Sequence, residues 1–118
     1  MLYRGSIAAG ALALAGSASS ARLFSASYDG HVTTFDFSGS SLTQVAQSTA
    51  CGPFPSWLTI EDRTMYCVNE GWGTPSELHS FSIGDGGLLS RLDNLTIAAG
   101  PVSSVVYGEN RRGLAVAN

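Results

Sequence analysis

Apolar and polar residues alternate in short runs along most of the chain, as in VTTFDF at 32–37 and LHSFSI at 78–83. A period of two predicts half-buried β-strands, and no segment shows the spacing of an amphipathic helix. Gly-rich turns such as GDGG at 84–87 favour hairpins between these runs. The pattern predicts an all-β chain with strands at 23–28, 32–37, 42–48, 57–60, 65–69, 78–83, 88–97, 102–107 and 113–118.

The chain also repeats itself. Phe35 and Phe81 hold equivalent places (81 − 35 = 46), as do Pro55 and Pro101 (101 − 55 = 46). Four antiparallel strands that recur every 40 to 50 residues or so are typical of a β-propeller blade. If the strands of a blade are called a, b, c and d, the nine expected strands form the series b-c-d, a-b-c-d, a-b.

This series amounts to about two blades, whereas propellers close their ring with roughly four to eight. We therefore expect an incomplete β-propeller, the N-terminal piece of a larger ring, that stops inside the apolar strand 113–118. The first three strands would await a strand a from the other end of the missing chain. A small sandwich of nine strands is the alternative, but it leaves the repeat unexplained.

The first 21 residues differ from the rest. Arg4 precedes an apolar run at 7–15, and small residues follow at 19–21, which predicts a signal peptide cut after Ala21 and a propeller segment over 22–118. The run is shorter than the roughly 20 residues that cross a bilayer, so we expect secretion without a membrane anchor. The alternative is a cytoplasmic protein with an apolar extension of its first strand.

Two features agree with secretion. Asn94 begins an Asn-Leu-Thr sequon, a candidate glycosylation site. Cys51 and Cys67 form an even pair near the same ends of two neighbouring strands, so a disulfide across one blade is reasonable. Two buried free cysteines are the alternative.

Charge and motifs exclude several classes of function. The chain has nine acidic residues, six arginines and no lysine, so no basic patch for nucleic acid is expected. The chain has no Walker loop, no dinucleotide fingerprint, no paired-Cys zinc spacing and no Gly-x-Ser-x-Gly elbow. We therefore expect neither a metal nor a cofactor.

Strand direction decides which loops share a face. The b–c and d–a loops lie on one face of a propeller, and here they collect aromatic and polar residues next to glycines and prolines. Glu70 is a candidate for a general base or hydrogen-bond acceptor, and His31 for a proton shuttle. An ordinary loop carboxylate and an exposed histidine are the alternatives. The candidates for substrate binding are Tyr28, Asn69, Trp72 and Asn118. For Trp57, at the start of an inner strand, packing between blades is the preferred interpretation.

Three stretches, CGPFPSWL at 51–58, MYCVNEG at 65–71 and LAVAN at 114–118, resemble the 6-phosphogluconolactonase and carboxy-cis,cis-muconate cyclase family of lactonase-type seven-bladed propellers. The resemblance implies seven blades and cofactor-free hydrolysis or formation of a lactone, with a small anionic lactone or carboxylate as substrate. Phe54 departs from it, because the family usually has an Asn there. The family's proposed His, Arg and Glu active-site residues would lie beyond residue 118, so the chain alone is expected to be inactive.

Two other functions remain open at this point. A secreted propeller that binds glycans or protein partners without chemistry fits the leader and the change at Phe54. A truncated and inert gene product is the third alternative.

Overall fold

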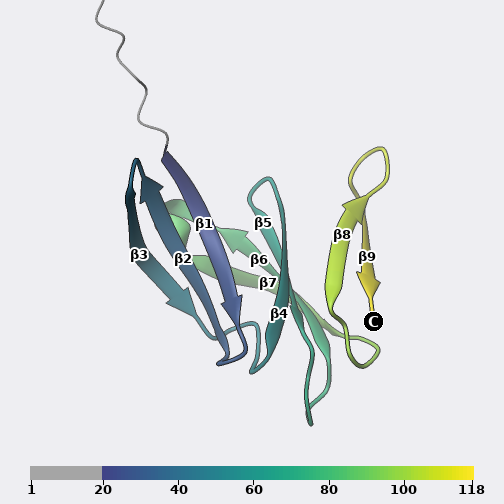
Figure 1. Cartoon of the computed structure of the whole chain (residues 1–118). Coiled ribbons are helices and arrows are strands. Elements are labelled where there is room, and N and C mark those ends of the chain that lie inside the picture. Colours follow the sequence, from purple (N-terminus) through teal and green to yellow (C-terminus); the bar gives the residue numbers. More distant parts are fainter. Residues whose placement is uncertain (1–19) are drawn as a thin grey trace, which may run out of the picture.

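The computed structural model describes residues 20–118, which form three antiparallel sheets in chain order (Figure 1). The first sheet has the order β1-β2-β3, the second β4-β5-β6-β7 and the third β8-β9. A short 3-10 turn, η1 (Asp85–Gly87), joins β6 to β7. The strands are β1 (Ser20–Ser27), β2 (His31–Ser38), β3 (Ser41–Ser48), β4 (Pro55–Glu61), β5 (Thr64–Asn69), β6 (Glu77–Ile83), β7 (Leu89–Thr96), β8 (Ser103–Tyr107) and β9 (Gly113–Ala117).

The order of strands confirms the predicted series b-c-d, a-b-c-d, a-b. The sandwich alternative is wrong, because the strands form three separate sheets along the chain and not two facing ones. Within the described residues β1 pairs only with β2. In the second sheet the strand equivalent to β1 is β5, and one edge of β5 pairs with β4, which is strand a. The edge of β1 that lies away from β2 corresponds to that edge of β5.

The repeat is visible in the irregularities of the sheets as well. The pairing of β2 with β3 shifts register after Thr34, and the pairing of β6 with β7 shifts after Ser80. These residues are 80 − 34 = 46 apart, the same interval as in the sequence. A bulge bends a strand and increases its local twist, so a bulge at the same position gives the two sheets the same local shape. The two sheets are therefore copies of one blade.

The predicted leader ends inside the fold. Residues 1–19 lie outside the described part of the chain, but β1 already begins at Ser20, and Ser20 and Ala21 pair with Ser38 and Phe37. A cut after Ala21 would remove both residues from this ladder. No helix among the described residues is long and apolar enough to span a membrane.

The core lies between the first two sheets, where inward side chains of β2, β5 and β6 meet. Its buried members are Val32, Cys51, Met65, Cys67 and Phe81. The η1 turn covers one end of this core, since the Thr34 hydroxyl donates a 2.9 Å hydrogen bond to the carbonyl oxygen of Gly87. The same period-2 alternation that predicted the strands thus supplies the apolar contact between blades.

The second and third sheets meet through hydrogen bonds. The Trp57 indole N–H donates to the carbonyl oxygen of Ser104 at 3.2 Å, and the Thr59 hydroxyl donates to the same oxygen at 2.8 Å. Trp57 therefore lies between β4 and β8 as expected, although 45% of its surface stays exposed.

Candidate functional site

The loops after β1, β3 and β5 bring four side chains together on one face of the molecule. Tyr28 follows β1, Phe54 precedes β4, and Glu70 and Trp72 follow β5. We call these four residues the Glu70 cluster. Their meeting follows from strand direction, because b–c and d–a loops share a face.

Glu70 is held by the polar edges of two aromatic rings. The Tyr28 hydroxyl donates a 2.7 Å hydrogen bond to Oε1, and the Trp72 indole N–H donates to Oε2. Glu70 is 8% exposed, whereas Tyr28 and Trp72 are 59% and 70% exposed. A buried carboxylate needs such donors to offset its lost hydration.

The same bond affects the tyrosine. The Glu70 carboxylate accepts a hydrogen bond from the Tyr28 hydroxyl, and this bond, with desolvation and the charge of Glu70, raises the pKa of Tyr28 above its ordinary value. The rings of Tyr28 and Trp72 are tilted by 48°, with centroids 6.4 Å apart. The two rings are therefore fixed relative to each other by one shared acceptor.

Phe54 is pinned through its backbone. Its N–H donates to Oδ1 of Asn69 at 3.0 Å, and its carbonyl oxygen accepts the N–H of Glu70, also at 3.0 Å. Asn69 is only 1% exposed. Asn69, predicted as a binding residue, is thus buried and holds the Phe54 loop through a hydrogen bond.

Gly52 makes that loop possible. Its φ of +100° is open to glycine, and a Cβ there would lie 2.5 Å from Nδ2 of Asn69. The loop can thus close on Asn69 only if residue 52 has no side chain.

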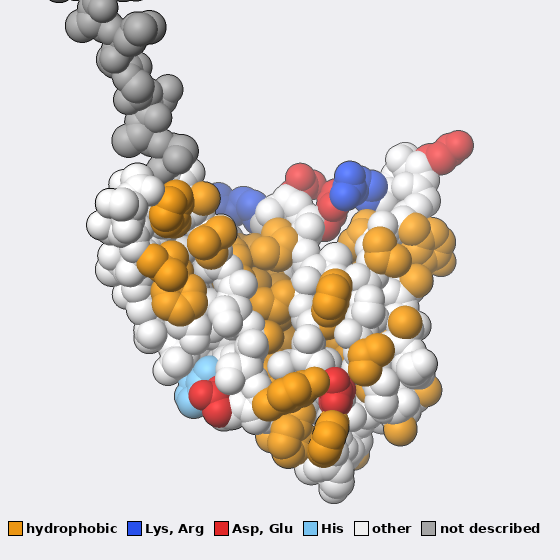
Figure 2. Space-filling model, viewed as in Figure 1, with side chains coloured by type: hydrophobic (Ala, Val, Ile, Leu, Met, Phe, Trp, Pro, Cys, Tyr) orange, Lys and Arg blue, Asp and Glu red, His pale blue; other side chains and the backbone are white. Residues whose placement is uncertain are grey.

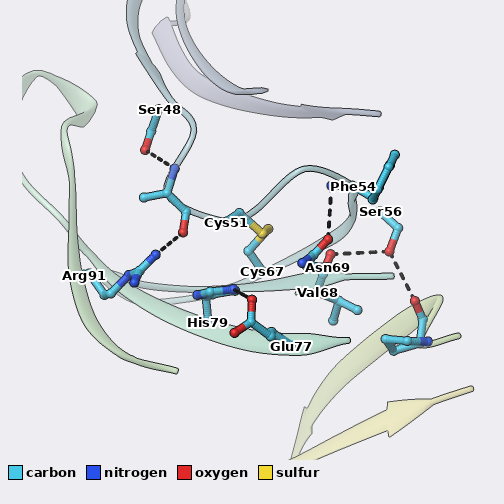
Figure 3. The surroundings of a disulfide bond; sticks show 12 residues. Ser48, Cys51, Phe54, Ser56, Cys67, Val68, Asn69, Glu77, His79 and Arg91 are labelled. Carbon is cyan, nitrogen blue, oxygen red and sulfur yellow. Dashed lines mark hydrogen bonds and ion pairs between the residues drawn. A yellow bond between two sulfur atoms is a disulfide. The ribbon is translucent and has the colours of Figure 1, made fainter. Parts of the chain in front are cut away.

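A disulfide fastens the same loop to β5 (Figure 3). Cys51 and Cys67 are bonded, with their Cα atoms 6.1 Å apart, and both are buried. Cys51 lies three positions before Phe54, and Cys67 lies two before Asn69. The bond therefore ties together the two segments that hold Phe54.

His79 lies directly opposite Cys67 in the pairing of β5 with β6 (Figure 3). Its Nε2 is 3.2 Å from Oε2 of Glu77, and it is 2% exposed. Burial lowers the pKa of His79 from its ordinary value, and this effect exceeds the opposing attraction of Glu77. A nearby arginine, Arg91, also lowers it. The sequence pattern gave no sign of this histidine beyond its place in a strand.

The other two predicted residues lie apart from the cluster. His31 begins β2, and its Nδ1 is 3.1 Å from Oδ1 of Asp29. The hydrogen bonds from His31 lower the pKa of the Asp29 carboxyl. Asn118 is exposed after β9. No hydrogen bond or ion pair of the described residues joins His31 or Asn118 to Glu70.

Three rings of the cluster, Tyr28, Phe54 and Trp72, line a hollow of about 200 Å³ that opens to solvent. In Figure 2 orange side chains spread over much of the visible face, red carboxylates appear at both the lower and the upper edge, and the blue arginines appear toward the upper edge. Three of these arginines are in ion pairs, Arg22 with Asp36, Arg63 with Asp85 and Arg111 with Glu61. The hollow is thus lined by aromatic side chains, with no arginine among them.

Sequence reasoning missed the role of Phe54, which it treated only as a lost polar group. The signal was present, since an aromatic residue inside a Gly-Pro loop on the candidate face is a common way to line a binding hollow. Among the described residues no group of three or more His, Cys, Asp or Glu side chains has the arrangement of a metal site.

Consecutive antiparallel sheets that repeat every 46 residues, with their b–c and d–a loops gathered on one face, define a β-propeller. The family model described as "Lactonase, 7-bladed beta-propeller" matches residues 13–118, and the chain belongs to this family. Neither a curated protein nor a solved structure matches the chain.

Proposed function

We propose that the chain contributes to a propeller enzyme that hydrolyses the lactones of sugar acids. The family match supports a lactonase-type propeller, and the Glu70 cluster on the loop face is the observation that carries the proposal. Aromatic walls beside a few fixed polar groups are typical of sites for small ring compounds.

Lactone hydrolysis sets clear chemical demands. Water attacks the carbonyl carbon, an oxyanion forms, and the ring C–O bond breaks to give a carboxylic acid and a hydroxyl group. A base must take the proton of the water, and donors must stabilise the oxyanion. Both Glu70 oxygens already accept hydrogen bonds from ring donors, so we assign Glu70 a positioning role and expect the base elsewhere in the ring.

The charges near the cluster favour a sugar-acid lactone over a carboxy-muconate. Carboxy-muconate carries several carboxylates and needs cationic partners to bind. No arginine lines the hollow. Arg22, Arg63 and Arg111 are paired with carboxylates, and Arg91 donates a hydrogen bond to the carbonyl oxygen of Ala50. Glu70, which contacts two of the rings that line the hollow, supplies a negative charge beside it, and this charge would repel a polyanion.

The proposal is tested with the full gene product in a pH-stat assay, which counts the acid released by each lactone. We expect turnover of the neutral glucono-δ-lactone above the spontaneous rate, and little with the anionic 6-phosphogluconolactone or carboxy-muconolactone. Trp72→Ala should lower kcat/KM by about tenfold, since one buried aromatic contact contributes roughly 1.4 kcal/mol. Leu92→Ala, on exposed β7, is the matched control. Hydrolysis of every lactone at the buffer rate would disprove the activity.

A second candidate is a propeller that binds glycans without chemistry. Its specific support is the engaged state of Glu70, since the cluster then offers aromatic surface but no free base. Saturable sugar binding by a protein that turns over no lactone would favour it.

We also propose that the protein passes through the secretory pathway, rather than residing in the cytoplasm. The Cys51–Cys67 disulfide and the exposure of Asn94 on β7 support this route, because disulfides persist in oxidising compartments and glycans need accessible acceptors. After expression in a eukaryotic host, we expect the protein in the culture medium, and its mass should fall after N-glycosidase treatment. Asn94→Gln should abolish that mass change, and retention of the protein inside the cells would contradict the proposal.

A further inference from the structure

The hollow between Tyr28, Phe54 and Trp72 has the properties of a ligand site for one ring. Each wall comes from a different loop, and Tyr28 and Trp72 keep more than half of their surface exposed. Large exposed aromatic side chains on neighbouring loops are unusual unless they meet a ligand or partner. The volume, about 200 Å³, lies below the roughly 300 to 1,000 Å³ that holds a drug-sized ligand. It therefore suits a single small ring.

Glu70 determines how the rings are presented. The Tyr28 hydroxyl and the Trp72 indole N–H, which donate to Glu70, both lie on ring edges, so the carboxylate contacts each ring at its edge. The ring faces remain free for other contacts. Because Glu70 is 8% exposed, it acts beneath the hollow as an anchor and not as part of its open surface.

The charge balance selects the ligand class. Glu70 is 8% exposed and does not line the hollow, so a cation there would lose hydration without direct access to the carboxylate. An anion would be repelled by the charge of Glu70, and no arginine lines the hollow to offset this repulsion. A neutral ring that presents C–H groups would gain contact with three aromatic surfaces at no such cost.

We infer that this hollow binds the C–H face of a neutral sugar-type ring, and that Glu70 is the positioning residue that orients Tyr28 and Trp72 for it. The inference rests on the proposed function for the choice of a lactone ring. Binding itself is independent of any hydrolysis and can be measured with an analogue that does not react.

The chain offers a built-in reporter, because it has only two tryptophans. In a Trp57→Phe background Trp72 is the only source of tryptophan fluorescence in the chain. Titration with D-glucono-δ-lactam, a neutral ring that water does not open, should change this fluorescence to saturation. Tetramethylammonium and D-gluconate serve as the cationic and anionic probes and should bind at least about tenfold more weakly.

Variants then test each wall and the anchor. Tyr28→Ala and Phe54→Leu should each weaken lactam binding by about tenfold. Glu70→Gln should weaken it several-fold and also reduce the near-ultraviolet circular dichroism of Trp72, because the amide accepts only one of the two ring donors. If the far-ultraviolet dichroism of Glu70→Gln is unchanged, the variant is folded and the change at Trp72 reflects the orientation of its ring. The control Leu92→Ala should change neither binding nor spectra.

The outcomes separate the two proposals. Lactam binding without lactone turnover would support the binding site and refute the proposed activity. Turnover without any response of Trp72 would support the activity and refute the binding site. Tighter binding of tetramethylammonium than of lactam would overturn the assignment to a neutral ring. An unchanged Trp72 signal and affinity in Glu70→Gln would overturn the positioning role.

Discussion

The Cys51–Cys67 disulfide should contribute much of the stability of the second sheet and its loop. The bond joins cysteines 16 positions apart. Closing a loop of that length removes roughly 10 cal/mol/K of chain entropy from the unfolded state, or about 3 kcal/mol at 25 °C. For the 118 − 19 = 99 described residues, an unfolding entropy of roughly 0.2 kcal/mol/K converts this into about 15 °C of melting temperature.

The assay compares thermal unfolding of the oxidised and the reduced protein by circular dichroism. Reduction should lower the melting temperature by about 15 °C. The double variant Cys51→Ala/Cys67→Ala is the control, with alanine chosen because both sites are buried and a serine hydroxyl would lack a partner. Its melting temperature should not respond to reductant.

Two results would refute this reasoning. A difference of less than about 3 °C between the oxidised and reduced forms would show that the cross-link does not restrain the unfolded chain as the entropy argument requires. A double variant that responds to reductant as strongly as the native protein would show that the effect does not come from this bond.

The buried His79 should make stability depend on pH. Its pKa in the folded protein lies below the unfolded value of about 6.5, so its contribution is complete above that pH and is lost as the pH falls below it, by at most about 1.4 kcal/mol per pH unit. Urea unfolding between pH 7.5 and 5 should show this loss for the native protein and for His31→Gln but not for His79→Gln; equal slopes in all three would contradict it. Gly52→Ala should destabilise the fold by about 3 kcal/mol, because a Cβ would meet Asn69 at positive φ. Gly39→Ala, also at positive φ but with open space around it, should cost only about 1 kcal/mol, and equal costs would remove the contact with Asn69 from the explanation.

Local patterns were enough to predict the strands. Period-2 alternation marked the strands at 32–37 and 78–83, and the turns and the repeat marked the others. The interval of 46 residues reappears in the register shifts after Thr34 and Ser80. The shared face of Tyr28, Glu70 and Trp72 followed as well, because strand direction alone decides which loops meet. The start of β1 at Ser20 was missed, since small residues that suit a signal-peptide cut also suit a strand.

The roles of individual side chains were less accessible. Asn69 ends strand b and Trp72 follows it, and both were predicted to bind substrate. The structure buries Asn69 under the Phe54 loop and leaves Trp72 open. Position along a strand gives the direction of a side chain, but the loop that folds over it comes from a distant segment.

The sequence by itself determined the all-β class, the blade repeat and the face on which the loops gather, because these depend on local periodicity and strand direction. Only the tertiary structure decided that Glu70 is held by two ring edges, that Phe54 completes the hollow, and that Cys51 and Cys67 fasten its loop. Those contacts join residues up to 42 positions apart. They depend on how one sheet packs against the next, which no local pattern records.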